Sequence, residues 1–123
     1  MYIELMASEQ INVPFTLPEM FAGFVAGNGL AKATPTELTL EFVVQDNVLN
    51  LLKTGVKEIH IPRSEIDWIQ HKRGWFGDKV NVRVKSLRWL AGLPGCDNAE
   101  VSLRISRRDR ARAGELVQIL APA

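Results

Sequence analysis

The central segment of this chain constrains the fold more than any other part. It contains three short runs of the kind found in β-strands, at Val56–Ile61, Ile66–Arg73 and Asp78–Lys85. Pro62 separates the first run from the second, and the sequence Gly-Trp-Phe-Gly at 74–77 separates the second from the third. Proline and glycine at these places predict a turn followed by a hairpin. We therefore expect three antiparallel strands here.

Alternating hydrophobic residues predict further half-buried strands on both sides of this unit. Glu37–Gln45 places Leu38, Leu40, Phe42 and Val44 on one face, and Glu100–Ile105 does the same with Val101, Leu103 and Ile105. Between the last two strands, Ser86–Asn98 predicts an elaborated connection with a short helical turn.

The chain before Glu37 carries weaker signals. Residues Met1–Pro18 hold two prolines and no sustained period, so we expect an arm or a strand that packs on the rest. The apolar run Phe21–Ala26, followed by Gly27-Asn28-Gly29, predicts a strand and then a turn. Asp46–Thr54 fits either a helical turn or a loop with apolar anchors.

One amphipathic helix is expected at Arg107–Ala121. Ser106 and Asp109 have the spacing of a capping box, in which each side chain accepts a hydrogen bond from a free backbone amide. The residues that form its apolar stripe are Ala113, Leu116, Val117 and Leu120. Pro122 is expected to end the helix.

These elements predict a single domain over residues 1–123. The fold class is a β-rich α+β domain, in which a bent antiparallel sheet forms a small, partly open barrel capped by the C-terminal helix. A chain of 13.8 kDa with 46% hydrophobic residues is large enough for one core. The expected core consists of Leu38, Leu40, Phe42, Ile59, Ile61, Ile66, Val80, Val82, Val84, Val101, Leu103, Ile105, Leu116, Val117 and Leu120.

The order of elements resembles the pleckstrin-homology superfold, particularly its bacterial variants, and a family of uncharacterised bacterial proteins with the same Gly-Trp-Phe-Gly hairpin. The resemblance is carried by the strand-Pro-strand unit Glu58–Ile66, the hairpin tip and the helix after Ser106. It implies a binding or assembly module without chemistry. Phosphoinositide-binding members carry a basic Lys-x(n)-Arg-type pattern on their first hairpin, whereas the matching stretch Gly27–Lys32 has one lysine. This departure argues against inositol-phosphate binding at that site.

The hairpin tip is the first candidate binding site. Trp75 and Phe76 lie between glycines, and cations flank them at Lys72, Arg73 and Lys79. Rings that point outward would offer a rigid apolar knob with a basic rim, which suits a partner groove or an anionic membrane. The alternative is that one ring folds back over the end of the sheet and plugs the barrel.

A second basic patch surrounds the start of the expected helix. It comprises Arg104, Arg107, Arg108, Arg110 and Arg112. Cations at this end oppose the helix dipole, so binding of an anion or of an acidic partner would account for them. The alternative is a solvated face in which Asp109 and other carboxylates compensate the charge.

No residue set predicts an enzyme, a metal site or a cofactor. His60 and His71 near Asp67, Glu58 or Glu65 match no ligand spacing, and the lone Cys96 follows a glycine in a loop beside Asp97. Trp68 and Trp89 are expected in the core or at the barrel end. The net charge of +1 argues against nucleic acid as a partner.

The sequence thus favours a non-enzymatic interaction module that binds a protein partner or self-associates through the Trp75–Phe76 tip, a sheet edge or both. The rival function is peripheral attachment to an anionic membrane through Lys72, Arg73, Lys79 and the same aromatic residues. The single cysteine and the absence of a secretory signal at the start predict a cytoplasmic location.

Overall fold

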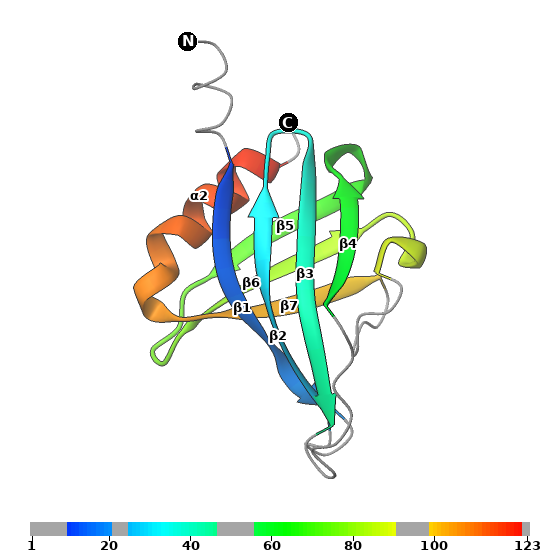
Figure 1. Ribbon diagram of the computed structural model, residues 1–123. Coiled ribbons are helices and arrows are strands. Elements are labelled where there is room, and N and C mark those ends of the chain that lie inside the picture. The colour runs from blue at the N-terminus through cyan, green and yellow to red at the C-terminus, as the bar shows by residue number, and fades with distance from the viewer. Residues whose placement is uncertain (1–9, 21–24, 47–55, 91–98, 122–123) are drawn as a thin grey trace.

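The computed structural model describes residues 10–20, 25–46, 56–90 and 99–121. These ranges contain seven strands, three short 3₁₀ helices and one α-helix (Figure 1). The strands are β1 Ile11–Met20, β2 Val25–Ala33, β3 Glu37–Asp46, β4 Lys57–Pro62, β5 Ile66–Lys72, β6 Asp78–Val84 and β7 Glu100–Ile105. The helices are η1 Arg63–Glu65, η2 Leu87–Leu90, η3 Arg107–Asp109 and α2 Arg110–Leu120.

All seven strands form one bent antiparallel sheet in the order β4-β3-β2-β1-β7-β6-β5. β4 and β5 are consecutive in the chain and lie at opposite edges, yet only the three residues of η1 join them. The sheet must therefore curl until its edges approach each other, and Figure 1 shows β1–β4 crossing in front of β5–β7. The sheet is not closed, and β1 and β7 share a single register pair, Thr16 with Arg104.

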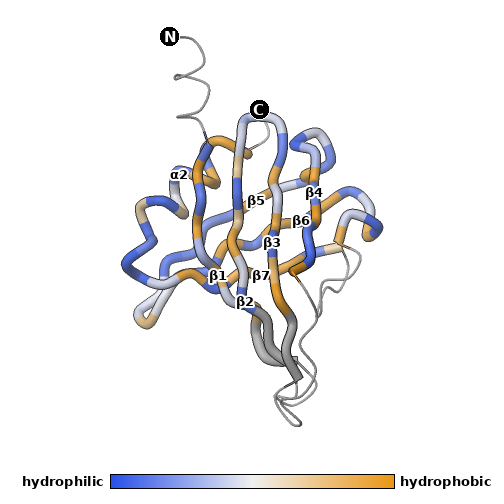
Figure 2. The backbone as a smooth tube through the Cα atoms, viewed as in Figure 1, coloured by the Kyte–Doolittle hydropathy of each residue, from blue (hydrophilic) through white to orange (hydrophobic). Residues whose placement is uncertain are grey.

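The concave side of the sheet holds the hydrophobic core, and α2 covers its open end. Ala113, Leu116 and Leu120 of the helix are buried there. Every residue of the expected core is buried except Val117, which is half-buried and packs at the margin. Figure 2 shows hydrophobic positions recurring along the strands. The predicted fold class is confirmed. No helix in the described ranges is long and apolar enough to span a bilayer.

The N-terminal part of the chain is more deeply built into the sheet than the sequence suggested. β1 lies between β2 and β7 and buries Val13, Phe15 and Leu17. The turn expected at Gly27-Asn28-Gly29 is wrong, because these residues lie inside β2. Gly29 lies beside Phe15 of β1 and Glu41 of β3, and a Cβ at residue 29 would meet the Glu41 carbonyl oxygen first and the Phe15 ring next. Close approach of a neighbouring backbone and an aromatic ring therefore explains this glycine.

Two further expectations were wrong in detail. The chain after Ser106 begins as η3, and neither Ser106 nor Asp109 makes a side-chain cap; the Asp109 carboxylate accepts a hydrogen bond from Arg112 at 2.6 Å instead. A β-bulge between Ile66 and Trp68 shifts the register of β5. The half-buried Trp68 ring therefore lies off the core, which β5 enters through Ile66 and Ile69.

The expectations for Trp89 and for the connection after β6 are met. Trp89 packs against the core and donates its Nε1 hydrogen to Glu65 at 2.9 Å, and η2 provides the expected short helical turn. The predictions for residues 47–54 and for Cys96 lie outside the described residues.

Candidate interaction site

Trp75 and Phe76 project from the tip between β5 and β6. Their side chains are 81% and 97% exposed, the two largest values among the exposed large hydrophobic residues of the described chain. The expectation of outward rings is met, and the alternative that a ring folds back over the sheet end is wrong. Gly77, which closes the tip, has a φ of +146°, a conformation that side chains with a Cβ rarely adopt. The glycine thus allows the turn that presents both rings.

A buried carboxylate at the base of the tip holds the hairpin together. Asp78, the first residue of β6, is 2% exposed. It accepts hydrogen bonds from His71 Nε2 at 2.7 Å and from the backbone amide of Gly74 at 3.2 Å. These bonds tie the end of β5 and the start of the tip to the start of β6.

The same carboxylate joins the hairpin to the helix. Arg110, the first residue of α2, donates from Nε at 2.9 Å and from Nη2 at 2.8 Å to the two oxygens of Asp78. This bidentate geometry is the strongest form of an arginine–carboxylate pair. The hydrogen bonds from Arg110, and then those from His71 and Gly74, hold the pKa of Asp78 far below its usual value, although burial acts to raise it. The pair in turn raises the pKa of Arg110.

Two arginines also bind the backbone of the tip directly. Arg110 Nη2 donates to the carbonyl of Gly74 at 2.9 Å, and Arg107 Nη1 donates to the carbonyl of Trp75 at 3.2 Å. The tip is therefore fixed to η3 and α2 and is not an isolated hairpin. Figure 1 shows it beside the start of the helix.

The five arginines of the second basic patch consequently have different roles. Arg107 and Arg110 hold the tip, and Arg112 pairs with Asp109. Arg104 and Arg108 are exposed and make no ion pair within the described part of the chain. Asp109 thus compensates the charge of Arg112, whereas Arg104 and Arg108 are free to contact a ligand.

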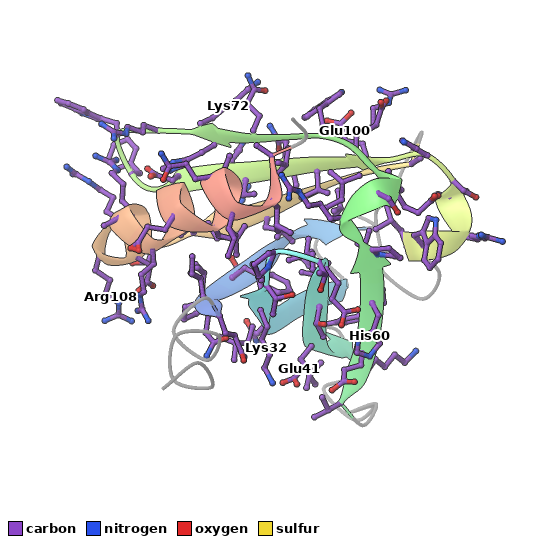
Figure 3. All side chains as sticks on the ribbon, turned by 90° about the horizontal axis from the view of Figure 1, so that it is seen from above. Lys32, Glu41, His60, Lys72, Glu100 and Arg108 are labelled. Carbon is purple, nitrogen blue, oxygen red and sulfur yellow. The ribbon has the colours of Figure 1, made fainter. Side chains whose placement is uncertain are left out.

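The exposed cations continue across the sheet as a row. Lys72 of β5 lies opposite Lys79 of β6, and Lys79 lies opposite Arg104 of β7. Directly opposed residues share a face, and all three are exposed. In Figure 3, Lys72 projects on the side away from Lys32, Glu41 and His60, which belong to β2, β3 and β4. The net charge of +1 hides this concentration of positive charge.

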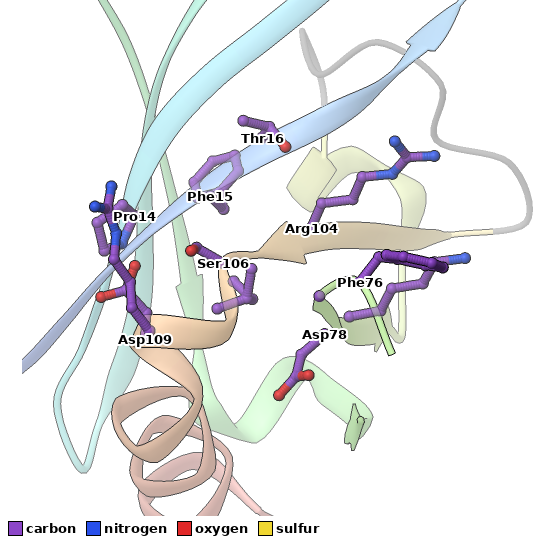
Figure 4. Close-up of a pocket in the computed structure, with 12 residues that line it drawn as sticks. Pro14, Phe15, Thr16, Phe76, Asp78, Arg104, Ser106 and Asp109 are labelled. Carbon is purple, nitrogen blue, oxygen red and sulfur yellow. The ribbon is translucent and has the colours of Figure 1, made fainter. Parts of the chain in front are cut away.

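A groove of about 610 Å³ runs beside this row, where β1 and β7 diverge. It is lined by Pro14, Phe15, Thr16, Phe76, Gly77, Asp78, Lys79, Arg104, Ile105, Ser106, Arg108 and Asp109. Figure 4 shows β1 on one side of the space and Phe76 on the other. The two sequence-predicted patches therefore meet: Lys79 and Phe76 belong to the first, and Arg104 and Arg108 to the second.

The histidines are separated in the fold. His60 lies beside Thr39 Oγ1 at 3.1 Å and Glu58 Oε1 at 3.0 Å, whereas His71 is engaged by Asp78. Glu65 is bonded to Trp89, and Asp67 lies 3.9 Å from Arg83. Within the described ranges, no three His, Cys, Asp or Glu side chains are grouped to hold a metal ion.

The Asp78–His71–Arg110 cluster escaped sequence reasoning, although a signal exists. Asp78 precedes Val80, Val82 and Val84 at period two, so it occupies an inward position of β6. Arg110 precedes Ala113 by three residues and so extends the apolar stripe of the helix. A charge of each sign in an inward position predicts a buried pair.

Neither a protein-family model nor a curated protein matches this chain.

Proposed function

We propose that this chain is a non-enzymatic interaction module that docks onto a protein partner through the Trp75–Phe76 tip. The single observation that carries the proposal is the exposure of two large aromatic side chains on a tip whose backbone is held by Arg107 and Arg110. Aromatic residues and arginine are the side chains that most often dominate binding energy at protein interfaces.

The fixed tip favours binding for an entropic reason. Association costs free energy when flexible loops become ordered at an interface. Here Asp78 ties both ends of the hairpin to α2 before any partner arrives, so the two rings are already positioned. A partner with an apolar pocket for Trp75 or Phe76 would meet a surface that needs little rearrangement.

The resemblance to the pleckstrin-homology superfold fits this proposal. An open seven-stranded sheet capped by a C-terminal helix supports it, and domains of that superfold serve as rigid platforms for partners. β4 and β5 are also edge strands of the described sheet, so a partner strand or a second copy of the chain has free backbone groups to pair with.

A second candidate, attachment to an anionic membrane, is favoured by the charge around the tip. Lys72, Arg73 and Lys79 are exposed and make no ion pair among the described residues. Basic residues near an anionic surface contribute about 1 kcal/mol each, and tryptophan settles at the headgroup level.

One set of variants separates these functions. Trp75→Ala with Phe76→Ala, the tip variant, removes both aromatic rings from the tip. Leu87→Ala serves as the control because Leu87 is also exposed but lies beyond the other end of β6. A protein that the native chain captures would be purified, and its affinity for each variant would be measured. Protein docking predicts that this partner binds the Leu87→Ala control like the native chain and binds the Trp75→Ala, Phe76→Ala variant weakly. Salt-sensitive sedimentation with vesicles of phosphatidylcholine and phosphatidylglycerol, without a protein partner, would favour the membrane instead.

A further inference from the structure

The row Lys72–Lys79–Arg104 is electrostatically unfavourable in the free protein. Like charges directly opposite each other on a sheet destabilise it, and here two such pairs are adjacent. Arg108 adds a further exposed cation at the groove. An anionic ligand would remove this repulsion, so the arrangement fits a surface that acts with a ligand bound.

The carboxylates beside the groove do not cancel this charge. Asp78 and Asp109 both line it, but Asp78 is buried and bonded to Arg110 and His71, while Asp109 is buried and bonded to Arg112. Their charge is already matched by other cations. The groove therefore presents the free positive charge of Lys79, Arg104 and Arg108.

The other walls of the groove suit an extended peptide. Thr16 and Ser106 offer hydroxyl groups, while Pro14 and Phe76 offer apolar surface (Figure 4). The volume of about 610 Å³ lies within the usual range of ligand sites. The recess between β1 and β7 has walls on both sides, so a chain segment can enter it, whereas a flat bilayer would meet the tip first.

We infer that the groove binds an acidic, extended segment of the protein partner, with carboxylates on Lys79, Arg104 and Arg108 and an apolar side chain on Phe76. This inference rests on the proposed docking function and names the chemistry of the partner. Charge complementarity decides the occupant: the free charge at the groove is positive, and arginine recognises carboxylates in a planar, bidentate manner.

The test uses the full chain labelled with ¹⁵N and a short glutamate oligomer as the probe, with the matching glutamine oligomer as its control. We expect localised amide shifts at Thr16, Arg104 and Ser106 with glutamate alone. Arg104→Ala with Arg108→Ala should weaken binding roughly tenfold or more, because charged hydrogen bonds are lost. Lys57→Ala with Lys85→Ala removes the same charge from exposed positions outside the groove and should weaken binding less than about threefold.

A second comparison tests the apolar contact. A glutamate oligomer with a central leucine should bind roughly threefold to tenfold tighter than the plain oligomer, and Phe76→Ala should abolish this gain, because a buried aliphatic side chain contributes about 1 kcal/mol or more. Equal affinity of both oligomers for the native chain would contradict the apolar contact.

Three results would overturn the inference: shifts spread over the whole surface, equal losses for the two cation pairs, or equal binding of the glutamine oligomer. Vesicle binding that depends on Arg104 and Arg108, without oligomer binding, would assign the groove to lipid. If the tip variant loses its partner while both cation pairs behave alike, tip docking stands and the groove inference fails. If the tip variant keeps its partner while the oligomer still binds at the groove, docking through the tip fails and acidic binding at the groove stands.

Discussion

Arg110 and Asp78 lie 32 residues apart in the chain and form a bidentate ion pair at 2.8 and 2.9 Å, which joins the start of α2 to the start of β6. The Asp78 side chain is fully shielded from solvent in this pair. Because Asp78 also bonds to His71 and Gly74, one carboxylate sets the position of the hairpin tip relative to the helix. The proposed docking surface depends on this arrangement.

Replacing Asp78→Asn should destabilise the domain by roughly 1–3 kcal/mol, because a buried acceptor of charged hydrogen bonds is lost and one new amide N–H faces the Arg110 donors. Urea unfolding followed by circular dichroism measures this loss. Asp67→Asn is the control, since Asp67 is exposed and should change the free energy of unfolding by less than about 0.5 kcal/mol. Equal stability of both variants would contradict a structural role for Asp78.

The stabilising effect of Asp78 should depend on pH in a defined direction. Its pKa in the folded chain is lower than in the unfolded chain, so the charged form stabilises the fold above the unfolded pKa of about 4 and the effect is lost as pH falls below it. The difference in unfolding free energy between the native chain and Asp78→Asn should shrink as the pH falls below about 4. A difference that stays the same below that pH would contradict the ion pair.

Sequence patterns predicted most of the fold because alternation reports directly which residues face the core. Leu38, Leu40 and Phe42 and the valines of β6 are buried as expected. The sequence did not predict β1 as a central strand, because Pro14 and Pro18 interrupt the usual strand composition. Pro14 occupies an exposed position of β1. The glycines of β2 suggested a turn because the groups that require a glycine at position 29, the Glu41 carbonyl and the Phe15 ring, come from neighbouring strands.

The candidate site was predicted only in part, for a related reason. The aromatic tip is a local feature, and its residues are adjacent in the sequence. The groove and the Asp78–Arg110 pair depend on how β1, β7 and α2 meet, and no local pattern carries that information. The arginines of the expected basic patch have different roles for the same reason, because tertiary packing determines which guanidinium group lies beside a carboxylate.

Two glycines should respond to alanine in opposite ways. Gly77→Ala should destabilise the domain by roughly 1–3 kcal/mol, because Gly77 has a positive φ. Gly114→Ala should stabilise it by about 0.5–1 kcal/mol, because Gly114 lies inside α2 and a Cβ there meets only ordinary contact with His71. Thermal unfolding compares them directly; a stabilising Gly77→Ala would contradict the tip conformation.

The tip aromatics should matter little for folding. Trp75→Ala with Phe76→Ala should change the free energy of unfolding by less than about 0.5 kcal/mol per residue, since both side chains are almost fully in solvent. Leu116→Ala, in contrast, should cost about 2–5 kcal/mol because that side chain is buried between α2 and the sheet. Urea unfolding of both variants measures the contrast, and a large loss in the tip variant would mean that the rings pack on the domain.

The measurement that tests the central claim most directly is the affinity of one purified partner for three forms of this chain: native, Trp75→Ala with Phe76→Ala, and Leu87→Ala. Docking through the tip predicts that the aromatic variant binds roughly tenfold or more weakly, as expected when interface hot spots are removed, while the Leu87 variant binds like the native chain. Equal affinity of all three forms would contradict the account.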